Sequence, residues 1–521
     1  LGASLFGGVM NDEIQFNEKT LWAGGPKDIT PRGGDGPGSG FGCFLNFGGV
    51  FVKNLNTEAF DGTPAKNVLN YVRYLDLDKG IGGVNFSDKA GTKYTRRYFA
   101  SAPDGVIAAR YTAEGANKLH LVFRLIPGEE LHADNATYSA DGTGSFHGKL
   151  QTVYHNARIK VVPVGGTLRA TDEGIEVDGA SEVLLFLCGG TSFDSFSAER
   201  TSGDATQLAN RVKGIVDAAA AKSWDELLSA HTADFTSYMG RVDLQLTPNP
   251  SKRNTEDLVK YYGGSQSSKN SPDGLFLEEL YFHFGRYLGI SSSRGAQHVP
   301  NNLQGIWNNR ANAPWNSDVH TNINIQMNYW PIEQTNLSEC HEPFLNFIID
   351  NAKSYGWMTA AKRSGQTKGW TVYTESSIFG GMSTWGAQYT VANAWYCTHL
   401  WDHYRYTLDK DYLKRAFPAI WSSAEFWMER LKKDTRVKDG KWVCPNEWSP
   451  EHGPTEDGVP HAQQLVRANL QICRDAINAV GAAELGLTAA DVAKLDDYLD
   501  NLDTGLHTEA YDGTTWKQQA D

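Results

Sequence analysis

The chain contains 521 residues, with 48 Lys and Arg against 61 Asp and Glu, so its formal net charge is −13. This acidic excess argues against nucleic acid or an anionic membrane surface as a partner, because both attract basic patches. Apolar residues make up 40% of the chain and charged residues 21%, which is typical of a globular protein, and the longest apolar run, 183–188, is far too short to span a membrane.

The first two hundred residues predict β structure. Short runs rich in Val, Ile, Tyr and Phe, at 94–100, 105–111, 118–125 and 157–164, are separated by Gly, Asp and Asn turns. Strands at this spacing are typical of an antiparallel sandwich. The Gly-rich run 33–42 contains no GK[ST] sequence, so we interpret it as a loop tip rather than as a phosphate-binding loop.

Helical periodicity begins after Asp204. Apolar residues at helical spacing predict helices over 205–221 and 224–231, whereas the polar stretch 248–273 predicts a linker or loop. From residue 274 onward the predicted helices cover about 275–289, 325–335, 342–361, 387–407, 411–433, 460–481 and 488–502. Long polar and aromatic loops between helices are typical of an α/α toroid with a central site. A closed ring of six hairpins needs twelve helices, so we expect the ring to be incomplete within these residues.

The cysteines and histidines do not predict a metal site. The six cysteines are widely spaced and form no CxxC pair, which argues against a disulfide framework and a zinc ribbon. His399 and His403 are four residues apart on a predicted helix, a spacing that can hold a metal ion. The sequence offers no clear third ligand, so we interpret this pair as part of an ordinary helix face and predict no metal and no cofactor.

The aromatic and amide content favours a carbohydrate partner. The chain holds 15 Trp, 22 Tyr and 23 Phe, and sugar rings pack their C–H faces on such side chains while their hydroxyl groups bond to amides and carboxylates. The alternative is that large helical cores also use many aromatic residues.

Asn residues are densest over 301–330, beside Trp and His. Asn322 and Asn324 are two residues apart, which in an extended segment places both amides on one side. Two amide oxygens that converge in this way can orient one water molecule. Turn and helix-cap chemistry, which is common for Asn, is the alternative interpretation.

A second candidate site is the Pro-rich segment 444–454, which carries Glu447 and Glu451 beside Trp448. A carboxyl group held against an indole ring has a raised pKa, as a general acid requires. Glu447 and Glu451 are alternative candidates for this role, and a salt-bridged loop glutamate is the competing interpretation.

Five segments together resemble glycoside hydrolase family 95, whose best-known members are α-1,2-L-fucosidases. In chain order they are Gln15–Pro26 (QFNEKTLWAGGP), Asn302–Asn308 (NLQGIWN), Met327–Pro331 (MNYWP), Thr335–Pro343 (TNLSECHEP) and Ser449–Glu451 (SPE). The resemblance extends over essentially the whole chain.

The resemblance implies three domains: an N-terminal antiparallel β-sandwich over 1–203, a helical linker and loop over 204–273, and a catalytic (α/α)6 barrel over 274–521. The family places its base Asp in a motif resembling FQIDGN, and a further substrate-binding segment resembles HRHxSHL. Neither motif occurs in these 521 residues, so we expect the C-terminal part of the barrel to be missing from this sequence.

The implied reaction is inverting hydrolysis that releases terminal α-L-fucose from an oligosaccharide or glycan. Glu451 is then the general acid, and Asn322 and Asn324 hold the attacking water. The residues implied to line the sugar pocket are His320, Glu375, Trp385 and Trp395.

Three other functions remain open at this point. An α-L-galactosidase of the same family would differ in the fit at His320, and the chain could be a catalytically inactive glycan-binding protein. The acidic charge disfavours a polysaccharide lyase on the same type of toroid, since a lyase needs a basic pocket for uronates. The family also implies a periplasmic or secreted enzyme, because glycan-degrading bacteria usually export such proteins.

Overall fold

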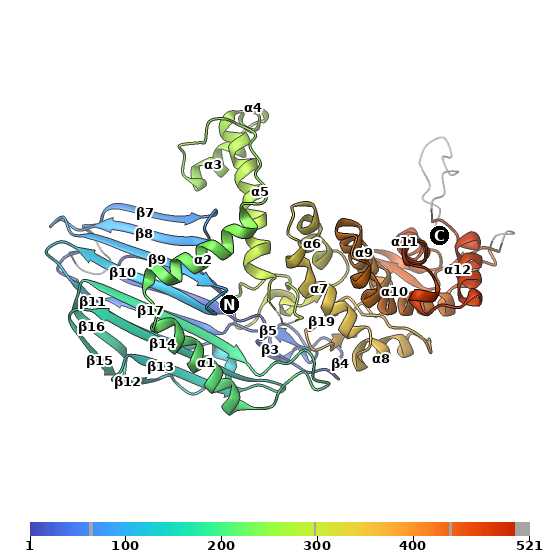
Figure 1. Ribbon diagram of the computed structural model, residues 1–521, viewed down its shortest axis with the longest axis horizontal. Coiled ribbons are helices and arrows are strands. Elements are labelled where there is room, and N and C mark those ends of the chain that lie inside the picture. The colour runs from blue at the N-terminus through green and yellow to red at the C-terminus, as the bar shows by residue number, and fades with distance from the viewer. Residues whose placement is uncertain (62–65, 296–297, 437–439, 506–521) are drawn as a thin grey trace.

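The computed structural model describes residues 1–61, 66–295, 298–436 and 440–505, and its N-terminal part is a sandwich of two antiparallel sheets (Figure 1). The six-stranded sheet has the order β1 (Gly2–Gly7), β2 (Asn11–Asn17), β6 (Gly48–Asn54), β11 (Leu119–Pro127), β16 (Gly174–Ala180) and β15 (Thr167–Thr171). The eight-stranded sheet has the order β12 (Thr137–Ser139), β13 (Thr143–Lys149), β14 (Tyr154–Val164), β17 (Glu182–Thr191), β10 (Val106–Glu114), β9 (Lys93–Ser101), β8 (Ile81–Ser87) and β7 (Leu69–Asp76).

The strands predicted at 94–100, 105–111, 118–125 and 157–164 are confirmed as β9, β10, β11 and β14. In β14, Ala157, Ile159 and Val161 alternate with half-buried residues and enter the core between the two sheets, where β11 contributes Phe123. This alternation follows from the period of two along a strand. The sandwich core therefore consists of the inward faces of both sheets.

Two helices cover the outer face of the larger sheet, which explains why β10 and β17 are apolar on both faces. They are α1 (Ala205–Ala220) and α2 (Trp224–Met239). The side chain of Asp204 caps α1, and Ser223 forms a capping box at the start of α2. Val212 and Leu227 of these helices lie in one buried cluster with Phe186 of β17.

The polar stretch 248–273 was predicted to be a linker or loop, and this prediction was wrong in part. It contains α3 (Thr255–Tyr262) and α4 (Gln266–Lys269), which lead into α5 (Pro272–Ser292). Side chains of Asn254, Ser265 and Ser271 cap these three helices, so the polar residues that indicated a loop are helix caps. The three helices project from the body of the molecule at the top of Figure 1.

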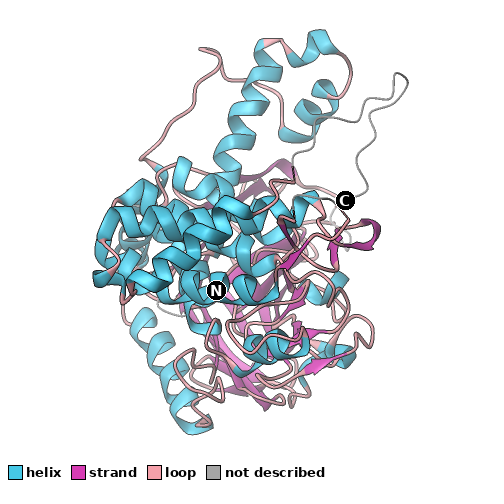
Figure 2. Ribbon diagram, turned by 90° about the vertical axis from the view of Figure 1, so that its right-hand side faces the viewer, coloured by secondary structure: helices cyan, strands magenta, loops and turns pink. Residues whose placement is uncertain are grey.

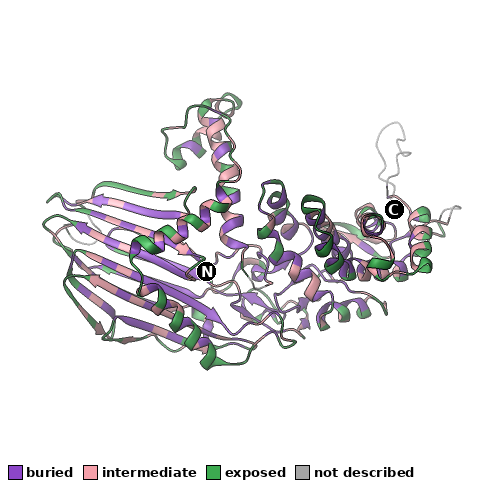
Figure 3. Cartoon of the chain, in the orientation of Figure 1, coloured by how far each residue is buried: buried purple, intermediate pink, exposed green. Residues whose placement is uncertain are grey.

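The remaining helices form a helical body beside the sandwich, and their inner faces are buried (Figures 2 and 3). They are α6 (Asn324–Gln334), α7 (Ser338–Asn351), α8 (Tyr355–Arg363), α9 (Ala392–Thr407), α10 (Lys410–Arg430), α11 (Pro460–Val480) and α12 (Ala489–Asn501). The single helix predicted over 342–361 is in fact α7 and α8, because Ser354 caps a new helix. Within the described residues, no helix is both long and apolar enough to cross a bilayer.

Short strands complete the fold. They are β3 (Trp22–Ala23) with β5 (Cys43–Phe44), β21 (Lys432–Lys433) with β22 (Trp442–Val443), β23 (Glu447–Ser449) with β24 (His452–Glu456), and the sheet of β18 (Val319–His320), β19 (Glu375–Ser376), β20 (Met382–Ser383) and β4 (Ile29–Thr30). The last two of these groups carry candidate site residues.

A buried polar network joins α6, α7 and α9 and includes the His399–His403 pair. Glu333 Oε1 accepts hydrogen bonds from Nδ1 of His341 at 2.8 Å and Nδ1 of His403 at 2.6 Å, and Oε2 accepts one from Ser338. His399 bonds to His341 at 3.1 Å, and the pair interpreted as an ordinary helix face is therefore part of a buried network.

Replacement of Glu333 by Ala should lower the free energy of unfolding by about 3–5 kcal/mol, because the change leaves the buried His341 and His403 and the half-buried Ser338 without their acceptor. The control is Glu339→Ala, which removes a half-exposed ion pair with Arg241 and should cost at most about 1 kcal/mol. Urea unfolding of both variants measures the difference. Equal losses of unfolding free energy in the two variants would contradict the expectation that the buried Glu333 carboxylate contributes more to stability than the half-exposed ion pair.

Candidate functional site

The small sheet β18–β19–β20–β4 assembles the first candidate residues. His320 of β18 lies directly opposite Glu375 of β19 in an antiparallel pair. On the far side, β20 pairs in parallel with β4 from the N-terminal region. Residues that are more than 50 positions apart in the sequence thus lie side by side, and a segment near residue 30 is held against them.

A buried charge cluster surrounds His320. Nδ1 of His320 lies 3.0 and 3.1 Å from the two carboxylate oxygens of Asp318, and Arg32 Nη1 lies 3.2 Å from Glu375 Oε1. Burial disfavours the imidazolium, but the surrounding carboxylates, Asp318 foremost, together outweigh burial and raise the pKa of His320. Burial and the Asp318 charge raise the pKa of Glu375 to about 7, although Arg32 opposes the shift.

The Gly-rich segment 33–42 was interpreted as a loop tip, but the structure packs it against this cluster. Its backbone N–H at Gly36 donates to Asn316 Oδ1 at 2.8 Å, and Ser39 is fully buried. Asn316 itself has a positive φ of 59°, a conformation that Asn tolerates better than most residues. Asp35 of the same segment pairs with Arg32 at 2.5 Å, so the segment lies beside the cluster.

The raised pKa of Glu375 predicts a pH-dependent stability. Between its ordinary pKa of 4.5 and about 7, the folded state keeps a proton that the unfolded state has released, so stability falls as pH rises through this window. Each pKa unit corresponds to about 1.4 kcal/mol. We expect Glu375→Gln to gain in melting temperature relative to the wild type from pH 5 to pH 8.

Melting curves at several pH values test this expectation, with Glu256→Gln on an exposed position of α3 as the control that should follow the wild type. Parallel curves for Glu375→Gln and the wild type would show that the carboxyl group does not titrate differently in the folded state.

The spacing of Asn322 and Asn324 suggested an extended segment, but the structure does not place them in one. Asn322 is in the turn after β18, and Asn324 is the first residue of α6. Asn322 is buried, and its Oδ1 has no hydrogen-bond partner among the described residues. A buried amide oxygen in this state has the capacity to accept a bond from a water molecule.

The two alternative glutamates of 444–454 occupy different environments. The segment forms the β23–β24 hairpin between α10 and α11. Glu447 is fully buried in β23 and is bonded to Thr390 and Arg430. Glu451 lies at the exposed tip between the strands and is close enough to His320 to help raise its pKa. Of the two, only Glu451 is free to meet a ligand.

The two tryptophans predicted to line the pocket, Trp385 and Trp395, lie in two separate groups of aromatic rings. Trp385 follows β20 and lies 6.4 Å from the His320 ring and 6.2 Å from Trp448 of the hairpin, measured between ring centroids. Trp395 of α9 instead packs 5.2 Å from His461 of α11 and 6.5 Å from Trp330 of α6. The structure therefore brings His320, Glu375 and Trp385 together with the hairpin, while the ring contacts of Trp395 belong to a neighbouring group.

Sequence reasoning missed Asp318 and Arg32. Asp318 stands two residues before His320 in extended backbone, so the i, i+2 spacing that was applied to Asn322 and Asn324 would have found it. Arg32 gave no sequence signal, because it reaches Glu375 only through the pairing of β4 with β20.

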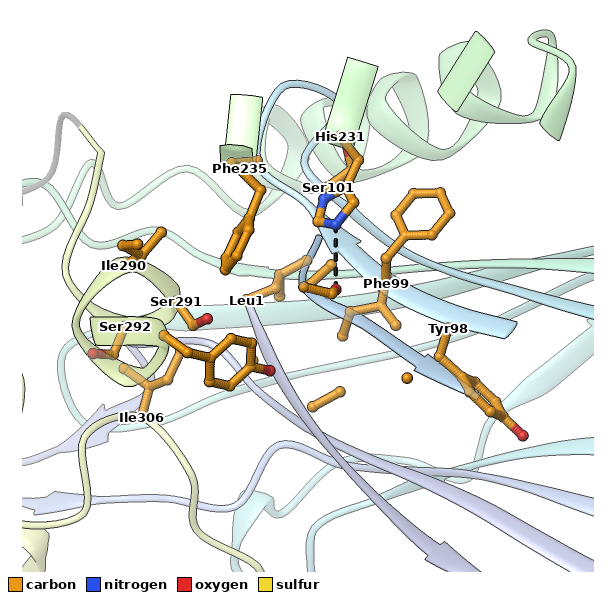
Figure 4. Close-up of a pocket in the computed structure, with 18 of the residues that line it drawn as sticks. Leu1, Tyr98, Phe99, Ser101, His231, Phe235, Ile290, Ser291, Ser292 and Ile306 are labelled. Atoms are coloured by element: carbon orange, nitrogen blue, oxygen red, sulfur yellow. Dashed lines mark hydrogen bonds between the residues drawn. The ribbon is translucent and has the colours of Figure 1, made fainter. Parts of the chain in front are cut away.

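A cavity of about 670 Å³ lies elsewhere, between β9, α2 and α5 (Figure 4). Leu1, Phe99 and Phe235 line it, and His231 bonds to the carbonyl of Lys79 beside it. Its described lining contains none of the predicted site residues and no Asp or Glu. The predicted site residues therefore lie away from this cavity.

Comparisons with known proteins place the chain among glycoside hydrolases. The sequence profile of the "Glycosyl hydrolase family 95 catalytic domain" matches residues 223–511, and that of the "Glycosyl hydrolase family 65, N-terminal domain" matches 35–196. The chain is 29% identical to "Probable alpha-fucosidase A" of Aspergillus niger over 97% of its length and to "Alpha-L-fucosidase 2" of Arabidopsis thaliana over 87%. It spans 67% and 58% of those two proteins.

A solved structure described as a putative kojibiose phosphorylase from the human microbiome matches 94% of the chain with a TM-score of 0.65, at 10% identity, and the chain covers 64% of it. This likeness concerns the fold alone. Together with the family 65 N-terminal match, it confirms the predicted fold class, an N-terminal β-sandwich followed by a linker and a helical toroid.

Proposed function

Because the chain belongs to glycosyl hydrolase family 95, we propose that the protein is an exo-acting, inverting α-L-fucosidase that removes terminal α-1,2-linked L-fucose from oligosaccharides or glycans. The two relatives named as α-fucosidases support this choice of sugar. The domain division at 203 and 273, and an exported location, are part of the same proposal.

The observation that carries the proposal is the position of Glu451 relative to the His320 cluster. Glu451 is the general acid that protonates the leaving oxygen. Asn322, with its unpartnered buried Oδ1, and Asn324 hold the attacking water, which a carboxylate base polarises. Inversion needs room for a water molecule opposite the acid.

The sugar is bound by the groups around the acid. His320 and Glu375 bond to its hydroxyl groups, and Trp385, about 40% exposed, packs on a C–H face of the ring. Trp395 extends this aromatic wall on α9. The pKa of Glu375 is raised to about 7, and the neighbouring carboxylates raise the pKa of His320 and favour its protonated form, so each is able to donate to a hydroxyl oxygen.

Proton NMR of the purified full chain with 2′-fucosyllactose tests the proposal. We expect β-L-fucose to appear first and to mutarotate later. If α-L-fucose appeared first, the proposed inverting mechanism would be wrong. Release from an α-L-galactoside but not from the fucoside would identify the α-L-galactosidase, and binding without hydrolysis would identify a glycan-binding protein.

A further inference from the structure

Glu447 is a fully buried carboxylate that the proposed chemistry does not use. It lies in β23, four residues before Glu451. Its carboxylate accepts hydrogen bonds from the backbone N–H of Thr390 at 3.2 Å and from the Thr390 hydroxyl. Arg430 completes the site, with Nη2 at 3.1 Å and Nε at 3.3 Å from Glu447 Oε1.

The partners of Glu447 come from the start of α9 and the end of α10. Thr390 stands just before α9, whose N-cap Val391 provides no side-chain cap, so the carboxylate meets the positive end of that helix. Arg430 ends α10 and also donates to the carbonyl of Pro445 at 3.2 Å. One guanidinium therefore holds the incoming strand of the hairpin at Pro445 and at Glu447.

No described residue anchors the outer end of the hairpin in a comparable way. Residues 451–454 are exposed, and β23 and β24 pair only at Glu447 with Glu456 and at Ser449 with His452. The position of Glu451 near His320 therefore depends on the buried base of the hairpin. A displacement of about 1 Å at a catalytic group can cost about 10²-fold in rate.

We propose that Glu447 is a positioning residue for the general acid: its ion pair with Arg430 and its bonds to Thr390 fix the hairpin so that Glu451 meets the glycosidic oxygen. This inference rests on the proposed function. Removal of the Glu447 charge loosens the hairpin base and misplaces Glu451, while the sugar-binding groups on β18, β19 and β20 keep their places.

A comparison of two substrates tests the inference. 2′-Fucosyllactose has a poor leaving group that needs protonation, whereas 4-nitrophenyl α-L-fucoside has a good one that needs little. Glu447→Gln should lower kcat on 2′-fucosyllactose by about 10²-fold, lower kcat on the aryl fucoside less than about threefold, and leave both KM values nearly unchanged. Thr390→Val removes one hydrogen bond and keeps the ion pair. It should lower the ratio of kcat on 2′-fucosyllactose to kcat on the aryl fucoside in the same way, but by a smaller factor.

The matched control is Glu279→Gln. Glu279 is also a buried carboxylate and accepts bonds from the backbone N–H groups of Leu246 and Thr247, but it lies on α5, far along the chain from the hairpin. The Glu279→Gln variant should keep the ratio of kcat on the two substrates at the wild-type value. If Glu447→Gln does not fold, Thr390→Val carries the same comparison.

The outcomes separate this inference from the proposed function. A proportional loss on both substrates in the Glu447 and Thr390 variants would show a purely structural role and overturn the inference. If Glu451→Gln itself leaves the ratio unchanged, the assignment of the acid fails and the inference fails with it. A changed ratio in the Glu451, Glu447 and Thr390 variants supports both.

Discussion

Replacement of Glu451 by Gln should lower kcat on 2′-fucosyllactose by about 10³-fold, within the range of 10²–10⁴ that general acid catalysis contributes. The amide keeps the size of the side chain but cannot deliver a proton to the leaving oxygen. Because the side chain is exposed at the hairpin tip, the melting temperature should stay within a few degrees of the wild type. Steady-state kinetics and thermal melting measure the two effects.

The matched control for this change is Glu456→Gln. Glu456 lies in the same hairpin, opposite Glu447 at its base, and is not assigned to the chemistry. Its replacement should retain most of the activity. Comparable losses of kcat for Glu451→Gln and Glu456→Gln would mean that any substitution in the hairpin impairs activity. That result would contradict the assignment of Glu451 as the acid.

The second large effect is expected at Asn322. Its buried Oδ1 has no partner among the described residues, so the native side chain is free to orient a water molecule for attack. Asn322→Ala should lower kcat by about 10²–10³-fold, the range seen when one positioned polar group is removed from an active site. KM should change little, since the water is not part of the bound sugar.

Asn346→Ala provides the control, because this α7 amide accepts a bond from Arg415 away from the site and should leave kcat near the wild-type value. A large rise in KM with an unchanged kcat in Asn322→Ala would instead show that Asn322 binds the sugar. That result would assign the water to another residue.

The strand and helix predictions succeeded where burial has a simple period. β14 is buried at every second residue, and α11 presents one apolar face, so each pattern is visible in the sequence. The predictions failed where a cap interrupts the pattern. The helix predicted over 342–361 breaks at Ser354, and the stretch 248–273 contains capped helices, because Ser and Asn favour loops and helix starts alike.

The sequence by itself determined the order of the motifs, and with it the family and the candidates Glu451, Asn322 and Asn324. Side-chain chemistry within the segment 444–454 left Glu447 and Glu451 as alternatives, and the family resemblance selected Glu451. The sequence carries no signal for the different environments of Glu447 and Glu451, because those environments depend on Arg430 and Thr390, which lie outside the segment.

Only the tertiary structure placed Arg32 and Asp318 around His320 and Glu375. It also decided the protonation of these groups, with the pKa of Glu375 raised to about 7. The physical reason is that a pKa depends on burial and on charges within a few ångströms in space. Arg32 lies 343 positions from Glu375 in the sequence (375 − 32), and no local pattern records that contact.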